Sequence, residues 1–137
     1  MRSGVRVRAR RARIGLMVAV AAVALSSCTP VEIIRSEFAA RGATSDQQDQ
    51  AIRVASCESG HGDPSSIDPQ AYSQGNYGMF QINWTAQRQR VEKLGFTKDQ
   101  LGDPTVNARV AADLWIDLGK IFGTTAGWSC ARRMGVR

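Results

Sequence analysis

The sequence contains few of the residues that bind transition metals. Its 137 residues include a single histidine, His61, and only three cysteines. If one cysteine is used elsewhere, the other two and the histidine do not supply the four ligands of a zinc site at a familiar spacing. We therefore predict no metal site, and the sequence implies no organic cofactor.

Acidic residues are absent from the first part of the chain. All 12 Asp and Glu residues follow position 28, whereas six of the 18 Lys and Arg residues precede position 14. Without that N-terminal segment, the basic and acidic residues balance. The formal net charge of +6 therefore belongs to one short segment, and we expect no nucleic-acid partner.

No apolar run in the sequence is long enough for a membrane-spanning helix, which needs about 20 residues. Residues 14–25 form a run of twelve mostly apolar residues after an arginine-rich stretch, an order typical of secretory signal peptides. The four residues Leu25-Ser26-Ser27-Cys28 resemble the bacterial lipobox, in which the cysteine is lipidated and becomes the new N-terminus. We predict a lipoprotein signal peptide over 1–27 and lipidation at Cys28. An ordinary cleaved signal with a chance cysteine is the alternative.

Lipidation of Cys28 would leave Cys57 and Cys130 as an even pair in an exported, oxidising compartment. Such a pair favours a disulfide. A crosslink that closes so long a loop stabilises a small domain by about 4 kcal/mol in the chain-entropy description. Two buried free thiols are the alternative to this Cys57–Cys130 disulfide.

The exported part of the chain is predicted to be mainly α-helical, because no internal repeat and no sustained strand alternation is present. Apolar residues recur at helical spacing over 31–38, and a second helix is expected over 85–94. Asp103-Pro104 is a typical start for another helix with a wide apolar face. Residues 60–78 are rich in Gly, Pro, Ser, Asp and Asn, which predicts a long loop with a small hairpin.

One further helix is predicted from about Asp46 to Glu58. Ser45 and Gln48 resemble a capping box at its start, and glycines at 60 and 62 end it. At about 100° per residue, Glu58 falls within roughly 60° of the apolar residues at 51, 54 and 55. Partial desolvation on this face would raise the pKa of the carboxyl, as a general acid requires. The alternative is a side chain that escapes to solvent at a fraying helix end.

A second motif, Tyr-Gly-Met-Phe-Gln-Ile-Asn, occupies residues 77–83 after the polar loop. Gly78 would permit close approach of a ligand to the backbone. The amides of Gln81 and Asn83 suit hydroxyl and acetamido groups, and Tyr77 could stack on a sugar face. In the simpler interpretation the glycine serves only a turn, and the methionine and isoleucine belong to the core.

Taken together, four features resemble the lysozyme-like superfamily: Cys57-Glu58-Ser59-Gly60, the Gly-Met-Phe-Gln-Ile-Asn motif, Asn107, and Trp128-Ser129-Cys130. The most similar groups are the soluble lytic transglycosylase-type domains and the actinobacterial resuscitation-promoting factors. The resemblance covers about residues 46–131. Glu-Ser-Gly alone is a weak signal, whereas its pairing with the second motif some twenty residues later is a strong one.

The resemblance implies an α-helical lysozyme-like domain with a cleft for alternating N-acetylglucosamine and N-acetylmuramic acid. It implies that Glu58 is the catalytic acid, and the terminal cysteine pairing of related groups agrees with the disulfide above. We divide the chain into a signal peptide (1–27), a lipidated N-terminus with a tether and a first short helix (28–45), and the lysozyme-like domain (46–137). The expected substrate-binding residues are Ser59, Tyr77, Gly78, Met79, Phe80, Gln81 and Asn83.

Two mechanisms remain open for cleavage of the β-1,4 glycosidic bond of peptidoglycan. Asp63 or Asp68 would serve as the second carboxylate of a hydrolytic lysozyme, although each precedes a proline and equally suits a turn. Without a second acid, the acetamido or 6-hydroxyl group of the substrate completes the reaction. That route is lytic transglycosylation with a 1,6-anhydro product, and the sequence favours it.

We therefore expect a monomeric envelope enzyme whose partners are peptidoglycan glycan strands and, through the lipid on Cys28, the membrane. If the lipobox is not used, the protein would be secreted. A non-catalytic peptidoglycan-binding lipoprotein is the alternative from another functional class. The retained Glu58 argues against it, because a protein that only binds has no need for a partly desolvated acid.

Overall fold

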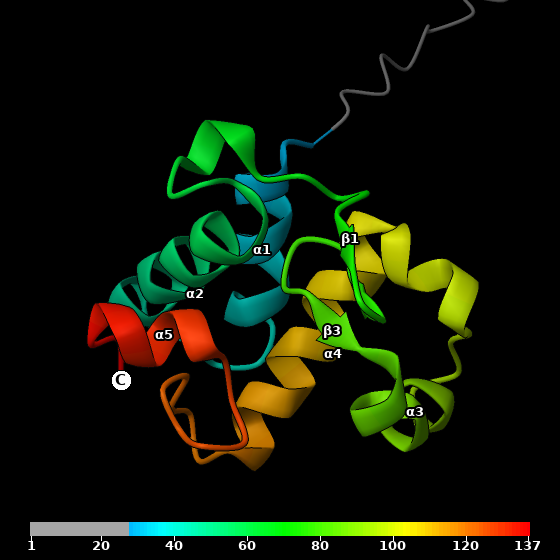
Figure 1. Ribbon diagram of the computed structural model, residues 1–137. Helices are drawn as coiled ribbons and strands as arrows, with labels where there is room; N and C mark the ends of the chain where they lie inside the picture. Colours follow the sequence, from blue (N-terminus) through cyan, green and yellow to red (C-terminus); the bar gives the residue numbers. More distant parts are fainter. Residues whose placement is uncertain (1–27) are drawn as a thin grey trace, which may run out of the picture.

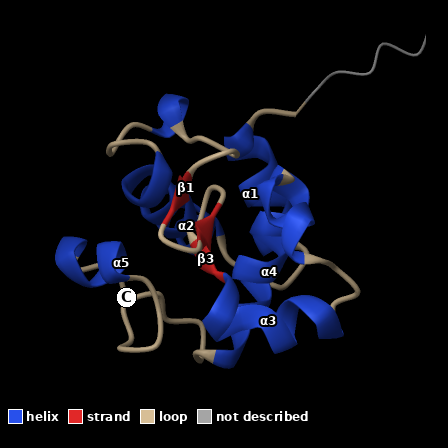
Figure 2. Ribbon diagram, turned by 45° about the vertical axis from the view of Figure 1, so that its right-hand side comes forward, coloured by secondary structure: helices blue, strands red, loops and turns tan. Residues whose placement is uncertain are grey.

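The computed structural model describes residues 28–137, so the predicted signal peptide 1–27 lies outside the described residues. The described chain is mainly helical, as predicted, with five α-helices around a very small sheet (Figures 1 and 2). None of the described helices is both long and apolar enough to cross a membrane. The helices are α1 (Pro30–Ala39), α2 (Ser45–Ser59), α3 (Trp84–Lys93), α4 (Pro104–Asp117) and α5 (Ser129–Met134).

The sheet has three antiparallel strands of two residues each, β1 (Tyr72–Ser73), β2 (Asn76–Tyr77) and β3 (Ile82–Asn83), in the order β1-β2-β3. The pair β1 and β2 is the hairpin predicted within residues 60–78. Two short 3₁₀ helices, Pro64–Ser66 and Lys98–Gly102, lie in the loops before β1 and before α4.

The start of α2 lies one residue earlier than predicted. Thr44 is the N-cap, and its backbone N–H donates to Oε1 of Gln47 at 2.9 Å while its hydroxyl accepts from the Gln47 N–H. Gln48, expected to close the capping box with Ser45, donates instead to the carbonyl of Ala43 at 3.0 Å. Both spacings match the capping pattern, so the sequence alone did not distinguish them.

The core is built around a cluster of four aromatic side chains, one of which belongs to α4. The ring of Phe38 in α1 lies 5.6 Å from Phe80, 5.5 Å from Trp115 and 5.7 Å from Phe122, measured between centroids. All four side chains are fully buried. Helix α1, which the sequence analysis grouped with the tether, therefore packs in the same core as the rest of the described chain.

A disulfide joins Cys57 in the last turn of α2 to Cys130 in α5, with 5.9 Å between the Cα atoms. The pairing predicted from the sequence is thus confirmed. Cys28 is free and exposed at the start of the described residues. The disulfide fixes the six-residue helix α5 against α2, since so short a helix is not stable on its own.

Loss of this crosslink should destabilise the folded protein. In the double variant Cys57→Ser, Cys130→Ser, we expect the free energy of unfolding to fall by about 4 kcal/mol, because the crosslink closes a loop of 73 residues. Urea denaturation followed by circular dichroism measures the change. Cys28→Ser is the matched control and should leave the midpoint unchanged. A loss below about 1 kcal/mol in the double variant would contradict the prediction.

Candidate functional site

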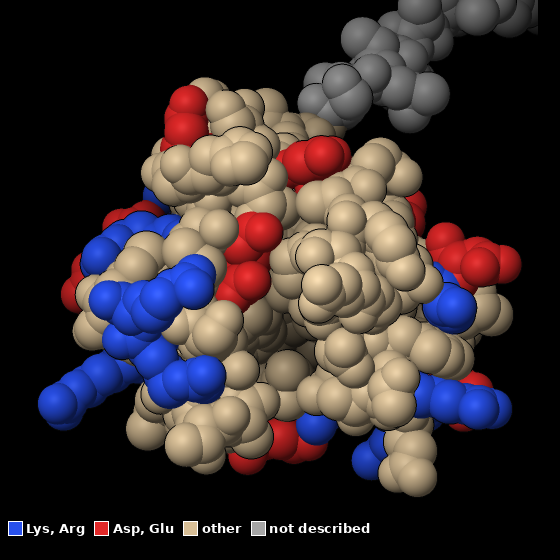
Figure 3. All heavy atoms as spheres, in the orientation of Figure 1, with Lys and Arg blue, Asp and Glu red and all other residues tan. Residues whose placement is uncertain are grey.

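A pocket of about 510 Å³ opens between the end of α2, the sheet, the start of α3 and the segment that leads into α5. Figure 3 shows the face of the molecule hollowed at this place. Most of its polar lining is uncharged and comes from amide and hydroxyl side chains. The lining residues used below are Glu58, Asn76, Gln81, Asn83, Trp128 and Arg133.

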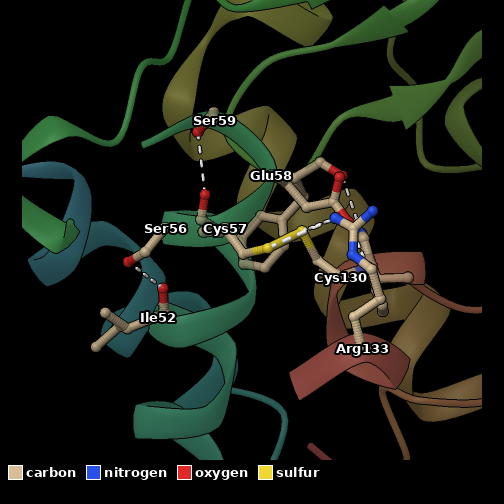
Figure 4. The surroundings of a disulfide bond; sticks show 10 residues. Ile52, Ser56, Cys57, Glu58, Ser59, Cys130 and Arg133 are labelled. Carbon is tan, nitrogen blue, oxygen red and sulfur yellow. Dashed lines mark hydrogen bonds between the residues drawn. A yellow bond between two sulfur atoms is a disulfide. The ribbon is translucent and has the colours of Figure 1, made fainter. Parts of the chain in front are cut away.

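Glu58 lies in the last turn of α2 and its side chain lines the pocket (Figure 4). The preceding residues of its helix face, Ala51, Val54 and Ala55, are fully buried, as the apolar arc predicted. Oε1 of Glu58 accepts a hydrogen bond from the backbone N–H of Cys130 at 3.3 Å. The side chain is therefore held at the pocket wall by α5, instead of turning away from a frayed helix end.

The pKa of Glu58 is raised above its ordinary value because burial penalises the charged carboxylate. Three weaker influences lower the pKa: the hydrogen bond from the Cys130 N–H and the positive charges of Arg133 and Arg132. Burial prevails over them. The carboxyl thus holds its proton to a higher pH than an exposed glutamate, which is the property of a general acid near neutral pH.

The segment of residues 77–80 is tied to α4 by the buried side chain of Asn107. Its Oδ1 accepts from the N–H of Phe80 at 2.9 Å, and its Nδ2 donates to the carbonyls of Tyr77 at 2.8 Å and Leu101 at 2.9 Å. One side chain therefore satisfies three backbone groups, two in residues 77–80 and one in the 3₁₀ helix Lys98–Gly102. Asn107 is one of the residues of the resemblance to lysozyme-like domains, and its structural role was not predicted from the sequence.

Gly78 is needed for this packing. Its φ of +71° is a conformation that L-residues rarely adopt, and a Cβ there would lie 2.3 Å from Nδ2 of Asn107 and 2.6 Å from the Leu101 carbonyl oxygen. Gly78 does not line the pocket. The turn interpretation of this glycine is therefore the one that the structure supports.

Met79 and Phe80 were expected to bind substrate, but both side chains are fully buried in the core. The backbone of Phe80 is held from two sides, since its carbonyl accepts from Nε1 of Trp128 at 2.9 Å and its N–H donates to Asn107. The turn at Gly78 directs these two apolar side chains inward. Their expected contact with a ligand is corrected to a role in supporting the pocket floor.

Gln81 and Asn83, by contrast, line the pocket together with Glu58. Nε2 of Gln81 donates to the carbonyls of Ala71 at 3.2 Å and Gly78 at 3.0 Å, which fixes its side chain. Oδ1 of Asn83 caps α3 by accepting from the N–H of Ala86 at 2.9 Å. Both amides are thus pre-organised by the backbone around them.

Asn76 is a pocket residue that the sequence analysis missed. It lies opposite Asn83 in the register of β2 and β3, and its Oδ1 accepts from Nδ2 of Asn83 at 3.0 Å. The signal that could have found it is the asparagine pair on neighbouring strands. That signal becomes visible only when the register is known, because the motif between them contains turn residues.

Ser59 and Tyr77 do not line the pocket. The hydroxyl of Ser59 donates to the carbonyl of Ala55 at 3.2 Å and so belongs to the end of its helix. The ring of Tyr77 packs on Tyr72 with 5.0 Å between centroids. The structure brings together Glu58, Gln81 and Asn83 among the predicted residues and leaves these two outside.

Asp63 and Asp68, the candidates for a second carboxylate, also lie outside the pocket. Asp63 accepts from the N–H of Ser65 at 2.9 Å and caps a 3₁₀ helix, and these hydrogen bonds lower its pKa. Asp68 accepts from the N–H of Gln70 at 2.8 Å. Both are turn residues, and Glu58 is the only carboxylate among the described residues that line the pocket.

Within residues 28–137, no three or more His, Cys, Asp or Glu side chains come together in a group that could hold a metal ion. Comparisons of the chain with models of protein families, with curated proteins and with solved structures found no match. The chemistry of the pocket is therefore the basis for a function.

A side chain at position 78 would cost stability in two ways: its Cβ would overlap with the Asn107 amide, and the positive φ would strain the backbone. A control glycine separates the two costs. We expect Gly78→Ala to lower the free energy of unfolding by at least about 3 kcal/mol, because a methyl group meets the Asn107 amide in addition to the backbone strain. Gly75→Ala is the matched control: φ is +85°, yet nothing lies within 4 Å of its Cβ position. That variant should lose only about 1–2 kcal/mol in the same urea titration. Equal losses would contradict the packing role.

The burial of Glu58 should make the protein less stable at neutral pH. Because the folded pKa is raised, the protonated carboxyl favours folding below the unfolded pKa, and this contribution is lost as pH rises through the folded pKa. We therefore expect Glu58→Gln to raise the Tm at pH 7 and to give no gain at about pH 3, below the ordinary glutamate pKa. Scanning calorimetry at both pH values tests this. Glu92→Gln, on the exposed face of α3, is the control, and an equal gain there would contradict it.

Proposed function

We propose that this protein cleaves the β-1,4 glycosidic bond between N-acetylmuramic acid and N-acetylglucosamine in peptidoglycan, with Glu58 as the general acid. The observation that carries the proposal is the half-buried Glu58 carboxyl, with a pKa raised by burial, at the wall of a 510 Å³ pocket. The proposed architecture is a lysozyme-like domain in which this pocket is part of the glycan cleft.

The polar lining of the pocket suits an uncharged sugar. Amide side chains at positions 76, 81 and 83 face it, and the indole of Trp128 adds an apolar wall. Amides can both donate to and accept from hydroxyl and acetamido groups, and a few well-placed polar groups fix the orientation of a small molecule in its site. These features support a saccharide as the ligand.

The proposed reaction is lytic transglycosylation, because Glu58 is the only carboxylate among the described lining residues. The C1–O4 bond breaks with its electron pair on O4, and O4 takes the proton of Glu58. The 6-hydroxyl oxygen of the muramic acid then bonds to C1, and its proton passes to the Glu58 carboxylate. No water is consumed, the acid is regenerated and the product carries a 1,6-anhydro end.

The proposal extends to the location of the enzyme in the cell envelope, exported and held at the membrane by a lipid on Cys28. Cys28 is exposed and directly precedes Thr29, the N-cap of α1. A lipid at this position would place the folded domain next to the membrane surface, within reach of the wall. The pocket is formed by other elements, so the anchor would not obstruct it.

The decisive test is the variant Glu58→Gln, assayed for release of soluble muropeptides from purified sacculi. Removal of a general acid lowers rates by about 10²–10⁴-fold, so we expect loss of release with an unchanged circular dichroism spectrum. Glu92→Gln, an exposed glutamate on α3, should retain full activity. Undiminished release by Glu58→Gln would remove Glu58 from its role.

Mass spectrometry of the released products separates the two chemistries. Anhydro ends are expected for transglycosylation, whereas reducing ends, heavier by one water, would indicate hydrolysis. If the wild-type protein binds sacculi and releases nothing over long incubation, the non-catalytic binding lipoprotein is the better description and the proposal fails.

A further inference from the structure

Arg133 is a charged residue of the pocket that the proposed reaction has not yet used. It belongs to α5, is exposed, and lines the same pocket as Glu58. Its Nη2 donates to Sγ of Cys130 at 3.1 Å and lies 3.9 Å from Sγ of Cys57. Figure 4 shows the guanidinium lying over the disulfide, beside the Glu58 side chain.

The disulfide sets the relation between Arg133 and Glu58. Cys57 directly precedes Glu58 in α2, and Cys130 both donates its N–H to Glu58 and lies one helical turn before Arg133. The contacts to sulfur therefore hold the arginine on the side of the pocket where the carboxylate lies. An exposed arginine without such contacts would spread over many rotamers.

Arg133 and Glu58 form no ion pair in the described structure, since their charged atoms are not within 4.0 Å of each other. At a longer separation, the positive charge still stabilises a carboxylate while leaving the carboxyl able to keep its proton. A direct ion pair would favour the ionised form strongly and leave no proton to donate.

We propose that Arg133 is a positioning residue for the proposed glycosidase reaction: fixed over the disulfide, its charge stabilises the Glu58 carboxylate that forms when the glycosidic oxygen takes its proton. This inference rests on the proposed function. The stabilised carboxylate is the same group that then accepts the proton of the 6-hydroxyl. Arg133 acts through Glu58 and makes no bond to the reacting atoms.

The positive charges that affect the pKa of Glu58 all come from α5. Arg133 has the larger effect on the pKa of Glu58 and Arg132 the smaller, and both lower it. The side chain of Arg132 is directed elsewhere, because its Nη1 donates to the carbonyl of Thr124 at 2.6 Å. From α2, the sheet, α3 and α4, no other ionisable group among the described residues lines the pocket besides the disulfide-bonded cysteines.

The test measures the pKa of Glu58 directly, so its result does not depend on activity. The chain contains four glutamates, and with ¹³Cδ-labelled glutamate the Glu58 resonance is assigned by its absence from Glu58→Gln. We expect Arg133→Gln to raise the pKa of Glu58 by about 0.5–1 pH unit, and Arg133→Lys to keep it near the wild-type value. The alkaline limb of muropeptide release should move upward by the same amount in Arg133→Gln.

Controls distinguish charge from packing. Arg35→Gln, which removes a comparable arginine paired with Asp49 on the α1–α2 surface, should leave the pKa of Glu58 unchanged. In the wild type, 0.5 M salt should raise the pKa of Glu58 by screening Arg133 and Arg132. If Arg133→Gln does not fold, Arg132→Gln decides the question: salt should still raise the pKa of Glu58 there through Arg133, and no salt effect in that variant would overturn the proposal.

An unchanged Glu58 pKa in folded Arg133→Gln, or an equal shift in Arg133→Lys, would overturn the role of Arg133. These outcomes leave the proposed function standing. Conversely, the pKa of Glu58 could shift in Arg133→Gln while the wild-type protein releases no muropeptides. That result would refute the proposed function and leave the electrostatic coupling between Arg133 and Glu58 intact.

Discussion

The buried amide of Asn107 is the constraint on which the rest of the site depends. Its three hydrogen bonds hold the turn at residues 77–80 and the carbonyl of Leu101 against α4. A buried backbone group without a partner is costly, so this side chain makes the close approach of two irregular segments possible. This turn directs Phe80 into the core and leaves Gln81 and Asn83 among the residues that line the pocket with Glu58.

The opposite wall depends on a covalent constraint. Helix α5 has six residues, too few to be stable alone, and the disulfide from Cys130 to Cys57 fixes it beside the end of α2. That attachment positions the Cys130 N–H on the Glu58 carboxylate and Arg133 over the sulfur atoms. The crosslink therefore shapes the electrostatics of the pocket in addition to stabilising the fold. A carboxyl whose pKa is raised by burial is common at functional sites.

Local patterns in the sequence predicted most of the fold and the surroundings of Glu58. Apolar spacing within α2 was sufficient, because the face of a regular helix follows from its period. The segment 77–83 was harder, since positive φ values at Gly78 and Gln81 interrupt any strand period and reverse the expected direction of Met79 and Phe80. Asn76 and Arg133 reach the pocket only through strand register and a crosslink that spans 73 residues, which periodicity does not encode.

The described pocket lining contains no second carboxylate. In the proposed reaction, the surroundings of Glu58 must therefore suit both of its protonation states. A single carboxyl has to give a proton in one half of the reaction and accept one in the other. Its pKa is then best placed near the working pH, because a weaker acid donates poorly and a stronger one is already ionised. Burial raises the pKa of Glu58, while the Cys130 N–H and Arg133 lower it. The influences that lower the pKa come from α5, which the disulfide joins to the end of α2 beside Glu58. The crosslink therefore also contributes to the pKa of the acid in the proposed reaction.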